Sequence, residues 1–303
     1  MRILLFGKNG QVGWELSSAL ASLGEVISFG SNEVNFTNID SIRDCVKRYK
    51  PNIIVNAAAY TAVDNAESNQ EEAYLINSEA VRVLAEEALH INALFVHYST
   101  DYVFDGQKEL PYTEEDLPNP LSVYGKTKLQ GDKFIQESGC RYLIFRISWI
   151  FCSYEKNFAR TILKLAKERD VLKIVNDQIG SPTDAKLVAT ITSLILYRII
   201  NNNDFTNSVN EIYNLTSAGE TSWHGFAFAL IQQAQSLGAK LRCAPENVKA
   251  ITTVEYPLPA KRPFNSTLNI NKLQTTFALQ LPSWELYSYR LVKELVERGF
   301  YES

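Results

Sequence analysis

Short apolar runs alternate with segments in which apolar residues recur at helical spacing through the first half of the chain. The apolar runs predict strands at Arg2–Phe6, Glu25–Phe29, Asn52–Asn56, Ala93–Tyr98 and Tyr142–Ile147. The periodic segments predict helices at Gln11–Leu23, Ile39–Tyr49 and Glu71–His90, with a further helix around Tyr124. Strands that alternate with helices are typical of a parallel sheet covered on both faces. Residues 1–150 therefore predict an α/β fold, a doubly wound parallel sheet of the Rossmann type that binds a dinucleotide.

The second half has a looser pattern. Helical spacing predicts helices at Phe158–Lys167, Lys186–Ile200, Trp223–Leu237 and Ser288–Arg298. A proline-rich stretch, Tyr256–Pro263, lies between the last two helices. We interpret residues 151–303 as mainly a second, smaller substrate-binding lobe that completes a cleft. The boundary near residue 150 is soft, because the chain is expected to cross between the two lobes.

Three glycines, Gly7, Gly10 and Gly13, follow the first strand and open the first helix. Glycines at such a turn let the backbone approach a pyrophosphate, and the helix N-terminus offers free N–H groups to it. The alternative is a glycine-rich turn without a ligand. The second strand ends at Ser31 with no carboxylate for a ribose hydroxyl, and Lys8 is a partial candidate for a 2′-phosphate. The choice between NADPH and NADH stays open, with a slight preference for NADPH.

Small residues end the third strand, in the segment Asn56–Thr61. In an open α/β sheet, ligands bind at the carboxyl ends of the strands. Small side chains at this edge would allow a cofactor to lie against the backbone. The alternative interpretation is a tightly packed turn.

Tyr124 and Lys128 are separated by one helical turn, so they share one face of a helix. A positive charge beside a phenol lowers the phenol pKa and favours proton transfer near neutral pH. A solvated helix surface also contains this spacing by chance. The glycine turn and the segment Tyr98–Asp101 favour the catalytic interpretation.

Composition narrows the class of protein. The chain has 303 residues, of which 46% are hydrophobic and 21% charged, with a formal net charge of −4. No Lys/Arg-rich run predicts nucleic-acid binding, and no apolar run reaches the roughly 18 residues of a membrane span. The scattered cysteines at Cys45, Cys140, Cys152 and Cys243 have no metal-ligand spacing, so we expect free thiols in the cytoplasm.

Together these motifs resemble the extended short-chain dehydrogenase/reductase superfamily and, more narrowly, the family of dTDP-4-dehydrorhamnose reductases. The resemblance extends over essentially the whole chain. Its main segments are 4–16, 55–64, 97–106, 123–128, 145–149, 176–183 and 262–266. It implies NAD(P)H-dependent reduction of the C4 keto group of dTDP-4-dehydro-L-rhamnose to dTDP-L-rhamnose, in dTDP-rhamnose biosynthesis.

The resemblance also implies roles for individual residues. Tyr124 would donate the proton, Lys128 would hold the nicotinamide ribose and lower the Tyr124 pKa, and Thr100 would hydrogen-bond the reacting oxygen. Cofactor-binding positions would be Gly7, Gly10, Gln11, Val12, Gly13, Asn35, Phe36, Ala59, Tyr60 and Thr61, together with Tyr124 and Lys128. Substrate-binding positions would be Thr100, Asp101, Trp149, Arg262 and Asn265. For Trp149 the alternative is a core aromatic residue, and for Arg262 a surface ion pair.

Two departures from the family pattern affect the expected ligands. Asn35 stands where many relatives carry an aspartate near the adenine, which would shift cofactor preference. Some relatives form a dimer bridged by magnesium between glutamates. Glu15 and Glu294 match two of these positions, but Lys186 occupies the third, and an ammonium cannot ligate a cation. We therefore expect no metal, and either a monomer or a metal-free homodimer.

Two other functions remain open at this level. A nucleotide-sugar 4,6-dehydratase or epimerase would share the cofactor half. Dehydratases, however, follow the catalytic threonine with an Asp-Glu pair, and here Tyr102 replaces the second carboxylate. A non-catalytic NADP-binding regulatory subunit is the other alternative, which an intact set of Thr100, Tyr124 and Lys128 disfavours.

Overall fold

A central parallel sheet organises the molecule. The computed structural model describes residues 1–300, apart from the side chains of Asn203, Asp204 and Thr206. The strands of the sheet are β1 (Arg2–Phe6), β2 (Glu25–Phe29), β3 (Ile53–Asn56), β4 (Leu94–Thr100), β5 (Arg141–Ile147) and β10 (Glu211–Asn214). They lie in the order β10-β5-β4-β3-β1-β2, and every neighbouring pair is parallel. The expected α/β fold with a parallel, Rossmann-type sheet is confirmed.

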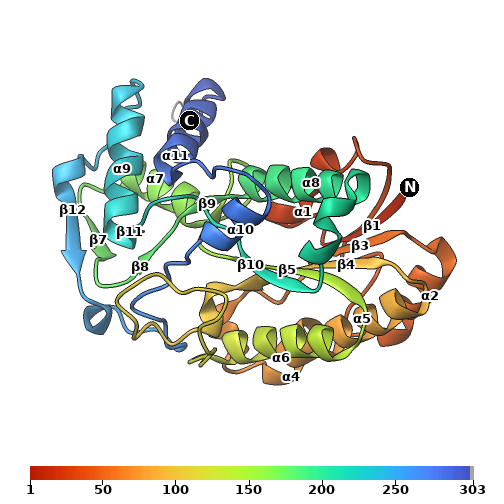
Figure 1. Cartoon of the computed structure of the whole chain (residues 1–303). Helices are drawn as coiled ribbons and strands as arrows, with labels where there is room; N and C mark the ends of the chain where they lie inside the picture. Colours follow the sequence, from red (N-terminus) through yellow and green to blue (C-terminus); the bar gives the residue numbers. More distant parts are fainter. Residues whose placement is uncertain (301–303) are drawn as a thin grey trace.

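Helices cover both faces of this sheet (Figure 1). Helices α1 (Gln11–Ala19) and α8 (Ala185–Asn201) lie on one face. The other face is covered by α2 (Ile39–Tyr49), α4 (Gln70–Tyr74), α5 (Ala80–His90) and α6 (Val123–Glu137). This double covering explains why β3 and β4 are buried along their whole length. Because α8 and β10 come from the second half, the chain returns to the sheet after residue 150.

The smaller lobe is built around α7 (Phe158–Glu168), α9 (Trp223–Ser236) and α11 (Trp284–Glu297), whose apolar faces share one core. Three short strand pairs frame it: β6 (Ile150–Phe151) with β9 (Thr183–Asp184), β7 (Leu172–Val175) with β12 (Val248–Ile251), and β8 (Ile179–Gly180) with β11 (Thr221–Ser222). The remaining elements are short: α3 (Val63–Ala66), η2 (Asp101–Val103), η3 (Asn203–Ser208), η4 (Pro245–Asn247), η5 (Thr253–Glu255) and α10 (Asn271–Thr276).

Capping side chains account for several helix boundaries. The Ser283 hydroxyl accepts the backbone N–H of Glu285, so α11 begins at Trp284 rather than at the predicted Ser288. Ser122 caps α6 in the same way, through the N–H of Gly125. Helix α1 ends at Ala19, before the predicted end at Leu23, because residues 20–23 form tight turns.

The predicted single helix Glu71–His90 is interrupted. A π-helical turn, η1 (Leu75–Glu79), separates α4 from α5. Within it, Asn77 is buried, and its side-chain amide accepts the N–H of Tyr60 at 2.9 Å and donates to the Tyr60 carbonyl at 3.1 Å. The widened turn places this amide against the loop after β3. Single π-helical turns within α-helices are frequent at functional sites.

The strand order defines one crevice at the carboxyl edge of the sheet. From β1 the chain moves outward to β2, then returns across β1 to β3. The loops that follow β1 and β3 therefore diverge, and ligands bind at such a switch point. Within residues 1–300, no helix is long and apolar enough to cross a membrane.

Candidate active site

The loop after β1 shows why glycine is needed there. Gly7 has a φ of +87°, and a Cβ on it would lie 2.6 Å from the backbone of Ala57. A Cβ on Gly13 would lie 2.0 Å from the Gly7 carbonyl oxygen. Gly10 is the N-cap of α1 and offers no capping side chain. The first N–H groups of α1 are thus available to an anionic ligand such as a pyrophosphate.

A cavity of about 760 Å³ lies at this edge of the sheet. Its walls include thirteen of the predicted site residues: Gly7, Gly10, Gln11, Val12, Asn35, Phe36, Ala59, Thr61, Thr100, Asp101, Tyr124, Lys128 and Trp149. The volume and the glycine-lined, uncapped helix end suit a dinucleotide.

Two predicted cofactor residues lie outside the cavity walls. Gly13 faces the Gly7 carbonyl, so it allows α1 to pack against the loop. The backbone N–H and carbonyl of Tyr60 are both bound by Asn77, and its hydroxyl accepts from Asn69 at 3.3 Å. These bonds fix the backbone of the loop after β3, and so hold its cavity-lining neighbours Ala59 and Thr61 in place.

The turn after β2, beside the cavity residues Gly30 and Ser31, contains a carboxylate that sequence reasoning missed. Glu33 folds back so that it accepts the Gly30 N–H at 2.7 Å and pairs with the Lys8 ammonium at 2.6 Å. Asn35 lines the cavity, while its side-chain oxygen accepts the N–H and hydroxyl of Thr37. The carboxylate was missed because it lies four residues beyond β2, in a turn rather than at the strand end.

Thr100 ends β4, and Tyr124 stands in the first turn of α6. The Thr100 hydroxyl donates to Asp101 at 3.1 Å, accepts the Tyr102 N–H at 3.2 Å and interacts with the Tyr124 hydroxyl. The rings of Tyr102 and Tyr124 meet edge to face, with centroids 5.7 Å apart. Tyr124 is thus held at the cavity wall with its hydroxyl beside that of Thr100.

Lys128 is 1% exposed, and its side-chain nitrogen lies 2.6 Å from the Tyr98 carbonyl oxygen and 3.0 Å from His97 Nε2. Burial lowers the Lys128 pKa to about 8, although Asp132 opposes the shift. In this structure the nitrogen thus contacts β4.

The expected lowering of the Tyr124 pKa does not occur in this structure. Desolvation raises that pKa above its usual value, and the charges of Asp101 and Asp132 act in the same direction, while the Thr100 hydroxyl opposes them. The pKa of Asp101 is also raised by burial, to about 6. Asp101 lines the cavity, and the hydroxyls of Ser266, Thr100 and Ser148 oppose the raised pKa of its buried carboxyl group.

Trp149 adopts an unusual backbone conformation, with a φ of +47°. Its ring stacks on that of Trp223, with centroids 3.5 Å apart and planes 5° apart, and both line the cavity. The Trp223 N–H donates to Gln178 Oε1 at 3.2 Å. Sequence reasoning missed Trp223, because its place at the start of a predicted helix gave no sign of this contact.

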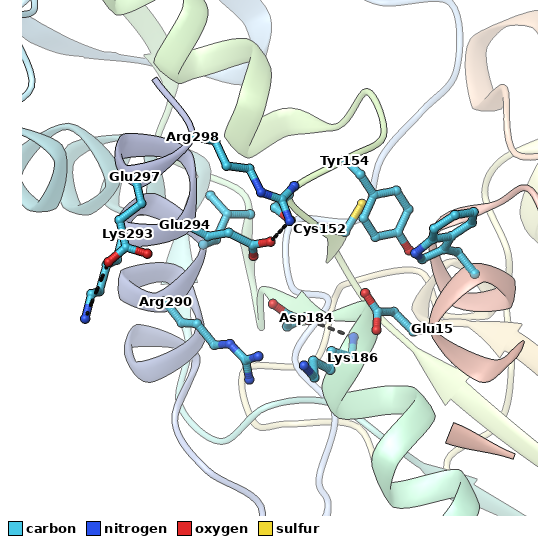
Figure 2. A pocket seen from close by; sticks show the side chains of 13 residues that line it. Glu15, Cys152, Tyr154, Asp184, Lys186, Arg290, Lys293, Glu294, Glu297 and Arg298 are labelled. Carbon is cyan, nitrogen blue, oxygen red and sulfur yellow. Dashed lines mark hydrogen bonds and ion pairs between the residues drawn. The ribbon is translucent and has the colours of Figure 1, made fainter. Parts of the chain in front are cut away.

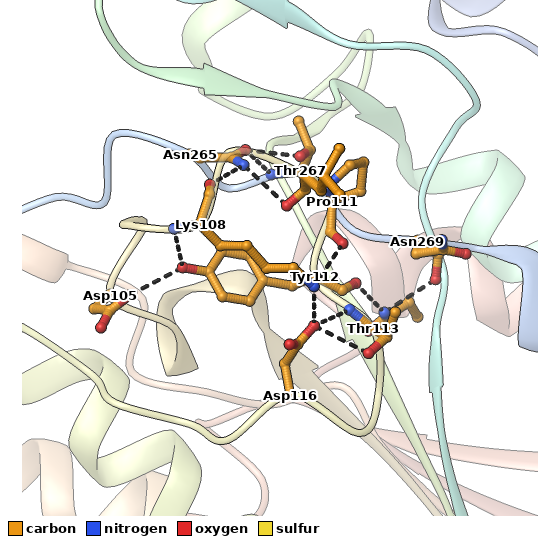
Figure 3. A network of polar contacts seen from close by, with 11 residues as sticks. Asp105, Lys108, Pro111, Tyr112, Thr113, Asp116, Asn265, Thr267 and Asn269 are labelled. Carbon is orange, nitrogen blue, oxygen red and sulfur yellow. Dashed lines mark hydrogen bonds and ion pairs between the residues drawn. The ribbon is translucent and has the colours of Figure 1, made fainter.

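Arg262 and Asn265 lie outside the cavity walls. Arg262 forms a two-pronged ion pair with Asp64, at 2.7 and 3.1 Å, and interacts with the Tyr102 hydroxyl at the cavity. Asn265 donates to the Lys108 carbonyl at 2.7 Å and accepts from Thr267 (Figure 3). Its side chain therefore ties the segment 105–116 to the segment 265–269.

A second cavity, of about 470 Å³, contains Glu15, Lys186 and Glu294 (Figure 2). Arg290 and Asp184 also line it, and the Asp184 carboxylate caps α8 through the Lys186 N–H at 2.7 Å. Desolvation raises the Glu15 pKa, and the positive charge of Lys186 opposes this shift. The structure thus brings Glu15, Lys186 and Glu294 together, and the positively charged Lys186 and Arg290 lie among the carboxylates.

Comparison with known proteins places this chain in a family. The family model described as "RmlD substrate binding domain" matches residues 1–297. The chain is 45% identical to "dTDP-4-dehydrorhamnose reductase" of Escherichia coli (strain K12), over 97% of this chain and 98% of that protein. It is 43% identical to a Burkholderia thailandensis protein of the same name, over 98% and 100%.

A solved structure agrees with these relatives. The dTDP-4-dehydrorhamnose reductase from Bacillus anthracis, in complex with NADP, is 33% identical and superposes with a TM-score of 0.86. The match covers 97% of this chain and 99% of that one. The chain therefore belongs to the dTDP-4-dehydrorhamnose reductase family.

Proposed function

We propose that this protein is an NAD(P)H-dependent oxidoreductase that reduces the C4 keto group of dTDP-4-dehydro-L-rhamnose to give dTDP-L-rhamnose, a step of dTDP-rhamnose biosynthesis. The observation that carries the proposal is the single cavity in which Thr100, Tyr124 and Lys128 meet the uncapped N-terminus of α1. Relatives with this reductase name support the sugar nucleotide as substrate.

The chain's contribution to cofactor binding begins at α1. The backbone of Gly10, Gln11 and Val12 would bind the pyrophosphate, and Ala59 and Thr61 would line the rest of the molecule. Lys128 would hold the nicotinamide ribose. When bound, the nicotinamide supplies the hydride for C4. The NADP in the Bacillus anthracis relative supports NADPH, and Lys8, paired with Glu33, would lie at the end where the two cofactors differ.

Tyr124 would donate the proton to the oxygen at C4. Its raised pKa keeps the phenol protonated at neutral pH, so the acid is loaded before hydride arrives. Thr100 would hydrogen-bond the same oxygen, since its hydroxyl lies beside that of Tyr124. The two hydroxyls would then stabilise the negative charge that develops there.

Acidic, aromatic, basic and amide side chains would bind the sugar nucleotide. Asp101 would accept a sugar hydroxyl, because it lines the cavity beside Thr100. Trp149, supported by Trp223, would pack against the sugar nucleotide. Arg262 would act at the diphosphate end, near Tyr102, while Asn265 would act through the loop that it ties down.

Turnover tests the proposal. The purified protein, mixed with NADPH and dTDP-4-dehydro-L-rhamnose, should consume NADPH and form dTDP-L-rhamnose. A parallel incubation of dTDP-glucose with NAD⁺ should yield no 4-keto sugar, because Tyr102 occupies the place of the dehydratase carboxylate. Absence of turnover in the first mixture, or a 4-keto product in the second, would refute the proposal.

We also infer the setting in which the protein works. Its four cysteines are buried and free, which suits the reducing cytoplasm. Either a monomer or a metal-free homodimer fits the second cavity, where Lys186 lies among the carboxylates.

A further inference from the structure

A chain of buried polar side chains lies behind Lys128. Asn56 on β3, His97 on β4 and Lys128 on α6 are 1%, 0% and 1% exposed. Asn56 Nδ2 lies 3.2 Å from His97 Nδ1, and His97 Nε2 lies 3.0 Å from Lys128 Nζ. None of the roles assigned above involves Asn56 or His97, and buried polar side chains of this kind are stable only when their donors and acceptors match.

One fixed donor sets the direction of this chain. The backbone N–H of Ala58 donates to Asn56 Oδ1 at 3.0 Å. The other end of the Asn56 amide is therefore its NH₂ group, which donates to His97 Nδ1. A neutral imidazole that accepts at Nδ1 carries its proton on Nε2. His97 thus presents an N–H, and not a lone pair, to Lys128.

A charged lysine has only donors, so it would meet the His97 N–H donor to donor. A neutral amine has one lone pair and two N–H groups. It accepts from His97 Nε2–H and still donates to the Tyr98 carbonyl at 2.6 Å. Turning the Asn56 amide around does not relieve the conflict, because its NH₂ would then face the Ala58 N–H.

The charged groups near His97, Lys128 and Tyr124 are Asp132 on α6, Arg146 on β5 and Asp101 after β4. Asp132, one turn along α6, has Oδ1 3.9 Å from His97 Nε2, and this oxygen has no hydrogen-bond partner among residues 1–300. It favours a proton on Nε2, and its charge favours the ammonium of Lys128. Arg146 on β5 is attracted to Asp132, and Asp101 acts on Tyr124. Burial works against both a charged His97 and a charged Lys128.

We propose that His97, oriented by Asn56, is a positioning residue that favours the neutral amine form of Lys128 in the cofactor-free protein. If Lys128 becomes an ammonium against the nicotinamide ribose, which rests on the proposed function, cofactor binding takes up a proton from solvent at Lys128. Affinity then falls as the pH rises above the Lys128 pKa of about 8.

The tautomer of His97 is directly measurable. The chain has three histidines, so ¹⁵N NMR of the cofactor-free, histidine-labelled protein resolves them. His224 is an internal reference, because its Nε2 lies 3.0 Å from the Val248 carbonyl and must carry a proton. We expect His97 to be neutral and protonated at Nε2. Protonation at Nδ1, or an imidazolium ring at neutral pH, overturns the proposal without bearing on the proposed reaction.

One isosteric substitution should reverse the hydrogen-bond directions between residue 56, His97 and Lys128. In Asn56→Asp, the carboxylate accepts from both Ala58 N–H and His97, so the His97 proton should move to Nδ1 and Lys128 should become charged. The exposed Asn38→Asp is the matched control, with the same amide-to-carboxylate change and no expected effect. A His97 that keeps its Nε2 proton in a folded Asn56→Asp variant overturns the proposal; the wild-type spectrum tests it even if this variant fails to fold.

Calorimetry supplies the second test. NADP⁺ binding, measured at pH 9 in buffers of different ionisation enthalpy, should take up about one proton in the wild type and almost none in Asn56→Asp. Equal, near-zero uptake in both proteins would overturn the inferred proton uptake, and would leave the reductase assignment to be judged by turnover.

Discussion

Replacing Tyr124 with phenylalanine separates chemistry from structure, because the change removes one hydroxyl. Thr100 would stay satisfied, since it still donates to Asp101 at 3.1 Å and accepts the Tyr102 N–H at 3.2 Å. No buried group loses its last partner, so the free energy of unfolding should change by less than about 1 kcal/mol. General acid catalysis is worth about 10²–10⁴-fold, so kcat should fall by that factor, about 2.7–5.5 kcal/mol of activation free energy.

The assay is single-turnover reduction with saturating NADPH and dTDP-4-dehydro-L-rhamnose, alongside NADPH titration and urea unfolding. Tyr142→Phe is the matched control, since it removes a tyrosine hydroxyl from β5, away from the cavity walls. A Tyr124→Phe rate within a few-fold of wild type would refute the proton-donor role. An equal loss of rate and of NADPH affinity would point instead to a damaged cofactor site.

Four further outcomes are expected. Lys128→Met should weaken NADPH binding by about 10–100-fold, whereas Lys126→Met, on the exposed side of the same helix, should not; unchanged affinity would exclude Lys128 from the site. Trp149→Ala should raise the KM for the sugar nucleotide more than that for NADPH; lower thermal stability with an unchanged KM would favour a packing role. The KM for the sugar nucleotide should rise as the pH falls through about 6, where the Asp101 carboxylate gains a proton and becomes a weaker hydrogen-bond acceptor. A pH-independent KM in Asp101→Asn would identify Asp101 as the titrating group, and a pH-independent KM in the wild type would contradict this prediction. EDTA should change neither activity nor size in light scattering, because Lys186 cannot ligate magnesium; a dimer that dissociates with chelator and re-forms with magnesium would show this expectation wrong.

Local periodicity explains why the first half of the fold was predictable. Strands β1, β3, β4 and β5 are largely apolar, and their burial follows directly from helices on both faces of the sheet. The segment Glu211–Asn214 gave no such signal. It is a four-residue strand whose place beside β5 depends on tertiary pairing. The same holds for the two-residue strands of the smaller lobe.

The site was predictable where motifs carry backbone constraints. Gly7 and the segment after β3 are adjacent because the sheet order requires it. Side-chain directions were not predictable in this way. Helical spacing placed Lys128 near Tyr124, but the fold turns its nitrogen towards His97 and the β4 backbone. The π turn at Asn77 likewise depends on a contact with Tyr60 that no local pattern reveals.

Isotope transfer tests the proposed reduction at C4 directly. The purified protein is incubated with dTDP-4-dehydro-L-rhamnose and NADPH that carries deuterium on the transferable position of the nicotinamide, and the sugar product is analysed by mass spectrometry and NMR. We expect dTDP-L-rhamnose with deuterium at C4 and one NADPH consumed per product. Recovery of unchanged 4-keto sugar, or a reduced sugar without deuterium at C4, would contradict the proposed reduction.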